Sequence, residues 1–317
     1  MHPHGAAGES VHQPVLLADT VALLHPKSGE TYLDLTAGYG GHAAEVIKHI
    51  GTARHATLVD RDTQAIAALQ PLTLAGARLI KSDFASAAKK MAEAGEQFDA
   101  ILLDLGVSSP QLDNAERGFS IQRPGPLDMR MDQSQQQTAA DIVNTYSEAQ
   151  LVQLIREYGE EPKAWAITRA IISARPLRTT TELADVITKV YRGKRTKTHP
   201  ATRTFQAIRI ALNQELGQLI QTLPLLPRLL KPGGRVAIIS FHSLEDRLVK
   251  QFFKEQAEAG FEAEMTLLTK KPISGLTQDV HNPRSRSAKL RAAAKIKTKE
   301  GYHANQGKNG YLAPLSG

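Results

Sequence analysis

Short apolar runs alternate with longer amphipathic runs along the first third of the chain. The apolar runs are rich in Ile, Leu and Val and lack a polar face, as strands covered on both faces do. Strands that alternate with helices form an open, mostly parallel sheet, so the pattern predicts an α/β fold. The predicted strands are Tyr32–Thr36, Ala56–Asp60, Arg78–Lys81 and Ala100–Leu105, and helices are predicted at Ala43–Ile50 and Thr63–Gln70.

The next clear strand signal, Arg235–Phe241, follows after roughly 130 residues, far more than an ordinary crossover connection needs. The intervening pattern is helical, with capping boxes at Ser147 and Thr179 that each precede an apolar run. We therefore expect a helical subdomain, residues 112–202, inserted after the fourth strand.

The sheet domain is then expected to consist of residues 12–111 and 203–296. Within it, the apolar stripe from Arg203 to Leu223 predicts one long helix. Residues 261–270 and 288–296 are predicted to pair as a closing antiparallel ribbon. Residues 297–317 are polar and contain Gly, which predicts a flexible basic tail.

Composition narrows the class of protein. The chain has 317 residues and no cysteine, which excludes disulfides and thiolate metal sites. It has no apolar run of membrane-spanning length and no secretion signal, so we expect a soluble cytoplasmic protein. We also expect no bound metal. Positive charge is concentrated in residues 188–209 and 282–317, which favours a polyanionic partner; a solvated face with a basic tail explains the charge equally well.

A glycine-rich turn follows the first predicted strand, and an acid stands directly before it. A dinucleotide site has Gly-x-Gly-x-x-Gly after the strand, so that a helix N-terminus receives the pyrophosphate. Here Asp34 precedes the turn that contains Gly40 and Gly41. The carboxylate would repel a phosphate and attract a cation, and the glycines would let the backbone approach a ligand. S-adenosylmethionine carries an ammonium and a sulfonium and no phosphate, so this site favours it as the cofactor.

Acids also end the later strands. Asp60 is placed to accept hydrogen bonds from the ribose hydroxyls, and Asp83 with Phe84 can hold an adenine. Asp104 ends the fourth strand, near where the transferred group must lie. The alternative interpretation, that these acids are helix N-caps, accounts for part of the pattern.

The residues after the fourth strand suggest the acceptor. Ser109 and Pro110 stand where enzymes that methylate exocyclic amines have a short polar residue followed by proline, although an ordinary turn explains the pair equally well. No nucleophile elbow surrounds Ser243, as a hydrolase would require, so His242 is interpreted as a polar pocket wall or helix cap. As part of the pocket wall, His242 is counted among the substrate-binding candidates. Phe119 and Trp165 are candidates for base stacking, Trp165 being better explained as core of the inserted subdomain.

Two basic segments are predicted to contact phosphates, because small polar residues are interspersed among their Arg and Lys side chains. The candidates are Arg195, Lys197 and Arg203 in the first segment and Arg284 and Arg286 in the second.

Several longer motifs resemble the bacterial ribosomal RNA small subunit methyltransferase H family over about residues 12–290. They comprise residues 32–42, 102–113, 116–120, 125–132, 199–207, 240–247 and 282–287. The resemblance implies a class I S-adenosylmethionine-dependent methyltransferase fold, Rossmann-like, with the helical insert described above. It also implies N4-methylation of cytosine 1402 in 16S rRNA. By motif match, the implied cofactor contacts are Gly40, Gly41, His42, Asp60, Phe84, Asp104 and Gln111.

The resemblance implies 16S rRNA or the small ribosomal subunit as the partner. Both a monomer and a homodimer are compatible with the sequence. Three other functions stay open from the residues alone: a nicotinamide oxidoreductase, a non-catalytic RNA chaperone and a small-molecule methyltransferase. The missing third glycine counts against the first of these, and the basic segments and large insert count against the last.

Overall fold

A single eight-stranded sheet forms the centre of the molecule, which was studied as a computed structural model that describes residues 14–192 and 198–296. The strand order is β3-β2-β1-β4-β5-β8-β6, and β7 pairs with β8 beside this series. β1 to β5 run parallel, and β8 runs antiparallel to β5, β6 and β7. The strands are β1 Tyr32–Asp34, β2 Ala56–Asp60, β3 Arg78–Lys81, β4 Phe98–Asp104, β5 Leu230–Ser240, β6 Met265–Leu267, β7 Ile273–Ser274 and β8 Lys289–Lys295.

Helices cover both faces of the sheet, because alternate residues of the central strands point to opposite sides. Leu33, Ile101 and Val236 pack on one face against α5, α12, α13 and α14. Tyr32 and Leu102 pack on the other face against α1 and α2. These helices, with those that flank them, are α1 Leu17–Leu24, α2 Gly41–Ile50, α3 Thr63–Ala68, α4 Gln70–Leu74, α5 Phe84–Glu93, α12 Glu215–Thr222, α13 Leu226–Leu229, α14 Ser243–Glu258 and α15 Gly275–Gln278. The α/β fold predicted from the pattern is confirmed.

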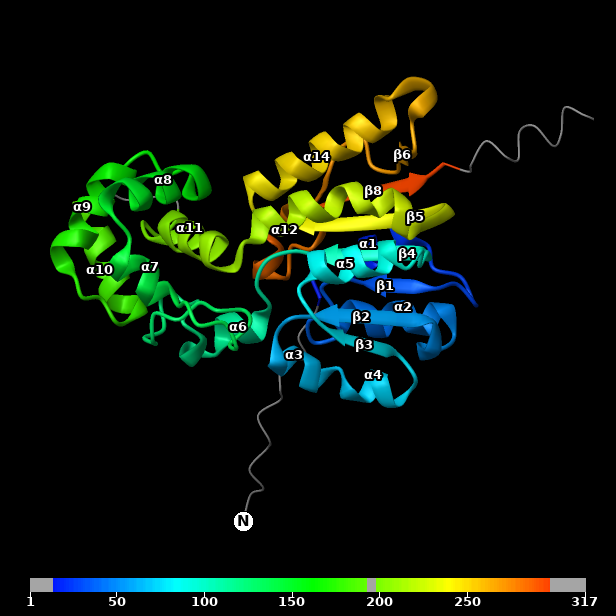
Figure 1. Cartoon of the computed structure of the whole chain (residues 1–317), viewed down its shortest axis with the longest axis horizontal. Coiled ribbons are helices and arrows are strands. Elements are labelled where there is room, and N and C mark those ends of the chain that lie inside the picture. The colour runs from blue at the N-terminus through cyan, green and yellow to red at the C-terminus, as the bar shows by residue number, and fades with distance from the viewer. Residues whose placement is uncertain (1–13, 193–197, 297–317) are drawn as a thin grey trace, which may run out of the picture.

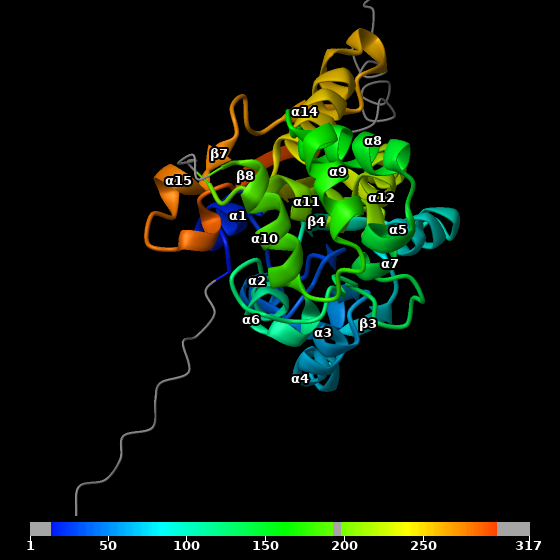
Figure 2. The same ribbon diagram turned by 90° about the vertical axis from the view of Figure 1, so that its left-hand side faces the viewer.

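A second, helical lobe lies beside the edge where the parallel strands end, and the arrowheads of β2 and β5 point toward it (Figure 1). In the perpendicular view its helices stand in front of β4 (Figure 2). The lobe has its own apolar core, which includes Ile142, Leu151, Ile167 and Leu183. The helices between β4 and β5 that precede α12 are α6 Ser109–Asp113, α7 Ala139–Thr145, α8 Glu148–Gly159, α9 Ala164–Ala174, α10 Thr180–Val190 and α11 Thr202–Asn213. The capping boxes predicted at Ser147 and Thr179 are confirmed at the starts of α8 and α10.

The long helix predicted from Arg203 to Leu223 is wrong, because the chain breaks at Gln214, whose φ of 53° is left-handed. Asn213, which falls off the apolar stripe, is fully buried, and its side chain bonds the backbone of Met129 and Met131. The first half, α11, therefore packs into the core of the lobe through residues such as Phe205. We accordingly place the end of the insert at residue 214 rather than 202.

The other predictions about the fold are confirmed in part, wrong, or outside the described residues. The antiparallel ribbon near the end of the chain is confirmed in part, as β6 pairs with β8. Helix α1 was not expected, and Trp165, expected in the lobe core, is 54% exposed on α9. The predicted tail, residues 297–317, lies outside the described residues. Within the described residues, no helix combines the length and apolar character needed to cross a bilayer.

Candidate functional site

A cavity of about 440 Å³ lies between the carboxyl edge of the parallel strands and the helical lobe. Its walls come from the segments that follow β1, β2, β3, β4 and β5, from α11 of the insert and from α12. A cavity of this size and place is where open α/β sheets bind small molecules. Most of the predicted site residues meet here: Gly41, His42, Asp60, Phe84, Asp104, Ser109, Pro110, Gln111, His242 and Arg284.

The glycine-rich turn after β1 forms part of the cavity wall, and its glycines pack closely against neighbouring residues. Gly38 donates its N–H to Oδ2 of Asp60 at 2.8 Å. Gly40 has a φ of 81° and does not line the cavity; a Cβ there would lie 3.0 Å from a methyl of Leu69. At Gly41 a Cβ would lie 2.4 Å from Pro14. The turn thus needs glycine for its backbone angle and its neighbours, and the contact of Gly40 with the cofactor stays a prediction.

Asp34 lies behind the cavity rather than on its wall, which corrects the prediction that it contacts a ligand. The alternation of β1 points its side chain back to the hydroxyl of Tyr32, from which it accepts a 2.8 Å hydrogen bond. It also accepts from the N–H of Thr36. Burial raises the pKa of Asp34 to about 7, since few groups compensate the charge of its carboxylate.

Asp60 does lie on the wall, held by two backbone donors. Its Oδ1 accepts from the N–H of Asp62 at 2.8 Å, and its Oδ2 accepts from Gly38. Burial raises the pKa of Asp60, although both backbone contacts oppose that rise. Each carboxylate oxygen has a second lone pair that a ligand hydroxyl can use.

Asp104 and His42 form the next part of the wall. His42 donates from Nε2 to the carbonyl of Val15 at 3.0 Å, and its Nδ1 lies 3.6 Å from Oδ2 of Asp104. The Oδ1 of Asp104 makes no hydrogen bond with any described residue. Burial, with the charges of Asp34 and Glu245, raises the pKa of Asp104 well above its usual value. A cation bound beside this carboxyl group would oppose that rise.

Helix α6 presents Ser109 and Pro110 to the cavity at its first turn. Ser108 caps the helix and forms a capping box with Gln111, whose Oε1 accepts from the N–H of Ser108. The amide of Gln111 then donates to Asp62 at 2.8 Å. Gln111, expected to bind the cofactor, is thus largely committed to fixing α6 in place.

A buried ion pair, missed by the sequence analysis, joins the sheet to the lobe. Arg117 is 1% exposed and donates from Nη1 to Oδ2 of Asp62 at 2.7 Å. Its Nη2 donates to the carbonyls of Arg130 and Met131. The motif of residues 116–120 drew attention to Arg117 in the sequence. Its partner could not be predicted, because Asp62 lies more than fifty residues earlier in the chain.

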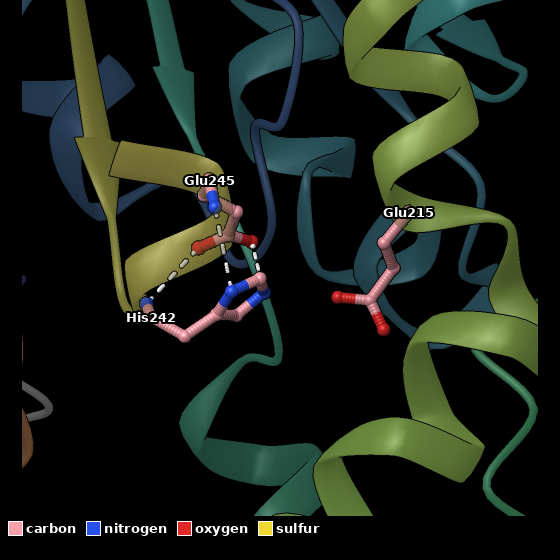
Figure 3. Close-up of side chains that lie close together, drawn as sticks. All are labelled: Glu215, His242 and Glu245. Atoms are coloured by element: carbon pink, nitrogen blue, oxygen red, sulfur yellow. Dashed lines mark hydrogen bonds and ion pairs between the residues drawn. The ribbon is translucent and has the colours of Figure 1, made fainter. Parts of the chain in front are cut away.

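A cluster of polar side chains forms the wall nearest β5 and the start of α12 (Figure 3). Arg209 holds Glu215 with two hydrogen bonds of 2.8 and 2.9 Å. His242 caps α14, and Glu245 returns from the first turn to bond the backbone N–H groups of Phe241 and His242. Burial alone would raise the pKa of Glu245, but its contacts with His242 and Arg209 hold it below the usual value.

One ligand atom each from Glu215, His242 and Glu245 lies within 4.8 Å of the others, a spacing that could hold a cation. Two contacts argue against that. Arg209 occupies both carboxylate oxygens of Glu215 and brings its own positive charge. The arrangement is therefore better described as a hydrogen-bonding cluster than as a metal centre, and the expectation of no metal stays a prediction.

The basic candidates are dispersed. Arg195 and Lys197 lie outside the described residues. Arg203 donates to the carbonyl of Glu160 and does not line the cavity. Arg284 lines the cavity rim and pairs with Asp113 through two 2.7 Å hydrogen bonds, while Arg286 is exposed outside it.

The two stacking candidates also separate. Phe119 lines the cavity, with its ring 5.9 Å from the guanidinium of Arg117. Trp165 lies on α9, packed against Arg169, and does not line the cavity. Trp165 thus lies neither in the lobe core, where it was expected, nor at the cavity.

Comparison with known proteins gives consistent matches. The chain is 49% identical over 296 residues to the ribosomal RNA small subunit methyltransferase H of Synechocystis sp.. The aligned region covers 90% of this chain and 93% of the relative. It is 43% identical over 307 residues to the protein of that name from Thermomicrobium roseum, with 90% and 94% covered. A solved putative methyltransferase from Streptococcus mutans, in complex with SAH, is 12% identical, covers 90% of this chain and 100% of that one, and superposes with a TM-score of 0.43.

The sequence model of the MraW methylase family matches residues 9–296 of this chain, almost its whole length. This match and the relatives confirm the resemblance inferred from the motifs. The chain belongs to the MraW methylase family.

Proposed function

We propose that this protein transfers a methyl group from S-adenosylmethionine to the exocyclic N4 amine of a cytosine in 16S rRNA, cytosine 1402 by the family resemblance. One observation carries the proposal. Acids at the ends of two parallel strands, Asp60 of β2 and Asp104 of β4, line one cavity together with Ser109 and Pro110. The names of the relatives support a small-subunit rRNA substrate and, with it, a cytoplasmic location.

The walls of the cavity fit a cationic nucleoside. Asp60 can accept from ribose hydroxyls, and the half-buried ring of Phe84 at the end of β3 can contact an adenine. The buried Oδ1 of Asp104 has no hydrogen-bond partner among the described residues, so this carboxyl group can interact with the sulfonium and with the amine that receives the methyl group. When bound, S-adenosylmethionine supplies a methyl carbon made electrophilic by its sulfonium.

The chain's own residues would prepare the amine. A cytosine amine is a poor nucleophile because its lone pair is delocalised into the ring. Oxygen acceptors from Ser109 and Pro110 can bond its hydrogens and hold the lone pair in line with the methyl carbon. The lone pair then forms the new C–N bond as the C–S bond breaks, its electrons stay on sulfur, and the nitrogen releases one proton to water.

The base must leave its stack to reach this depth, so the RNA backbone needs holding outside the cavity. We assign that role to the basic segments, through Arg195, Lys197, Arg203, Arg284 and Arg286. Arg284 pairs with Asp113 at the rim, so a phosphate would have to compete with that carboxylate. Arg291, farther along the chain, is 10% exposed and bonded to Asp246, so we do not assign it a phosphate contact.

Mass spectrometry of rRNA nucleosides tests the proposal. We expect cells that lack this protein to lose N4-methylated cytidine at one site of 16S rRNA, and the intact gene to restore it. The Asp60→Ala variant should fail to restore it at ordinary expression. Full methylation in the deletion strain, or loss of a different modified nucleoside, would contradict the proposal.

A further inference from the structure

The imidazole of His242 is the feature of the cavity that the proposed function leaves without a defined task. It follows β5, which pairs with β4 so that Ile239 lies opposite Asp104. The ring is 6% exposed and faces Glu215 across the gap in Figure 3. His242 thus stands on the same wall as the residues that would hold the reacting amine.

Hydrogen bonding fixes which ring nitrogen of His242 carries a hydrogen. The N–H of Glu245 donates to Nδ1 at 3.4 Å, as part of the capping box of α14. A neutral imidazole whose Nδ1 accepts has its hydrogen on Nε2. Nε2 lies 3.2 Å from Oε1 of Glu245, yet it completes no hydrogen bond with the described residues. The cavity wall therefore contains a buried N–H donor whose neighbouring acceptor, the carboxylate of Glu245, completes no hydrogen bond with it.

Among the described residues of the cavity wall, four have a buried polar atom without a hydrogen-bond partner. Arg61 and Gln218 both bond the carbonyl of Asn213, so they lie together on the Asp60 side of the cavity. Asp104 and His242 follow the two paired strands β4 and β5. This second pair offers one acceptor and one donor, which is the complement of an amine next to a ring nitrogen.

We propose that His242 reads the Watson–Crick edge of the target base, donating from Nε2–H to N3 of cytosine while the adjacent N4 amine lies at Asp104 and Ser109. The inference rests on the proposed function and adds the base subsite to it. Enzymes that act on flipped bases recognise them through this edge. The donor fixes the rotation of the ring in its plane, which aligns the amine with the methyl carbon.

A divalent cation at His242 is the competing explanation of the cluster, and the hydrogen bonds disfavour it. A metal ligand needs a lone pair on Nε2, but the N–H of Glu245 already uses the lone pair on Nδ1. Arg209 neutralises Glu215 through both of its oxygens. Glu215, held by Arg209, lies across from the His242 ring in Figure 3.

Two substitutions separate the two nitrogens of His242. In His242→Asn the amide oxygen can still cap α14 from the Nδ1 position, but no donor reaches the Nε2 position. In His242→Gln the longer amide can place an N–H near the Nε2 position. His49→Asn, an exposed histidine on α2 that bonds Glu45, is the matched control. Each protein is assayed on 16S rRNA ligated to carry either cytosine or 3-deazacytosine at the target position.

We expect wild type and His49→Asn to prefer cytosine over 3-deazacytosine by about 5- to 100-fold in methylation rate, the range for one good base contact. The ratio should fall to about one in His242→Asn and recover in part in His242→Gln. Intrinsic differences between the two amines cancel in this comparison of ratios. Calorimetric affinity for S-adenosylmethionine should be unchanged in both variants, which shows that the cavity is intact.

Three results would overturn the inference. An equal preference for cytosine in wild type and His242→Asn removes His242 from base recognition, while the proposed function stands. A rate that chelation abolishes and a divalent cation restores, in wild type but not in His242→Asn, makes His242 a metal ligand. If wild type forms no N4-methylcytosine at all, the proposed function itself fails and the subsite fails with it.

Discussion

The two halves of the cavity are built in different ways. The half around Asp60 comes from short segments that follow β1 and β2, each fixed by local hydrogen bonds such as that from Gly38. The half around His242 comes from residues far apart in sequence, where Arg209, Glu215 and Glu245 meet only because the chain breaks at Gln214. Local motifs predict the first kind of site, whereas the second kind depends on how the lobe packs.

The largest effect is expected from removing the buried ion pair between Arg117 and Asp62, which joins the sheet to the lobe. Arg117→Met leaves Asp62 buried without its partner, and we expect the free energy of unfolding to fall by about 3–5 kcal/mol. Urea denaturation measures it. The double variant Asp62→Asn with Arg117→Met should recover much of the loss, because Asn still caps α3 and no charge is stranded. A single variant as stable as wild type would show that the pair does not join the two halves.

The cofactor half is tested by Asp60→Ala. We expect the affinity for S-adenosylmethionine to fall by about 100-fold, since two charge-assisted hydrogen bonds to the ribose are lost. Isothermal titration calorimetry measures this, with the exposed Asp185→Ala on α10 as the control that should bind normally. Unchanged affinity in Asp60→Ala would remove Asp60 from the cofactor site.

Asp34, buried behind the Asp60 half of the cavity, should make the free energy of unfolding depend on pH in a predictable direction. Its folded pKa of about 7 exceeds the usual 3.8, so the folded protein holds a proton that the unfolded chain releases. Stability from this group is therefore complete at low pH and declines by about 1.4 kcal/mol for each pH unit between roughly 4 and 7. Asp34→Asn should lack this decline. Urea denaturation of both proteins at several pH values compares the slopes, and parallel slopes would contradict the assignment.

The smallest expected effect concerns the RNA side. Arg195→Glu with Lys197→Glu should weaken binding of 16S rRNA and reduce the slope of log K against log salt by about 1–2, as lost phosphate contacts do. Lys89→Glu with Lys90→Glu, on the exposed side of α5, is the matched control. If both double variants bind with the wild-type slope, Arg195 and Lys197 of the first basic segment do not contact phosphates.

The sequence predicted the parts of the molecule that short-range rules govern. Strand positions, the capping boxes at Ser147 and Thr179, and the acids Asp60 and Asp104 at strand ends all follow from periodicity and local spacing. The break at Gln214 did not follow, because a continuous apolar stripe passes through it and tertiary contacts of Asn213 override that stripe. The ion pair of Arg117 was hidden for the same reason, as its partner is distant in the chain.

Direct calorimetric titration of the protein with S-adenosylmethionine and with nicotinamide adenine dinucleotide, under identical conditions, tests the central claim that the acids of this cavity select a cation. We predict saturable binding of S-adenosylmethionine that Asp60→Ala weakens, and no binding of the dinucleotide. Binding of the dinucleotide with none of S-adenosylmethionine would contradict the account.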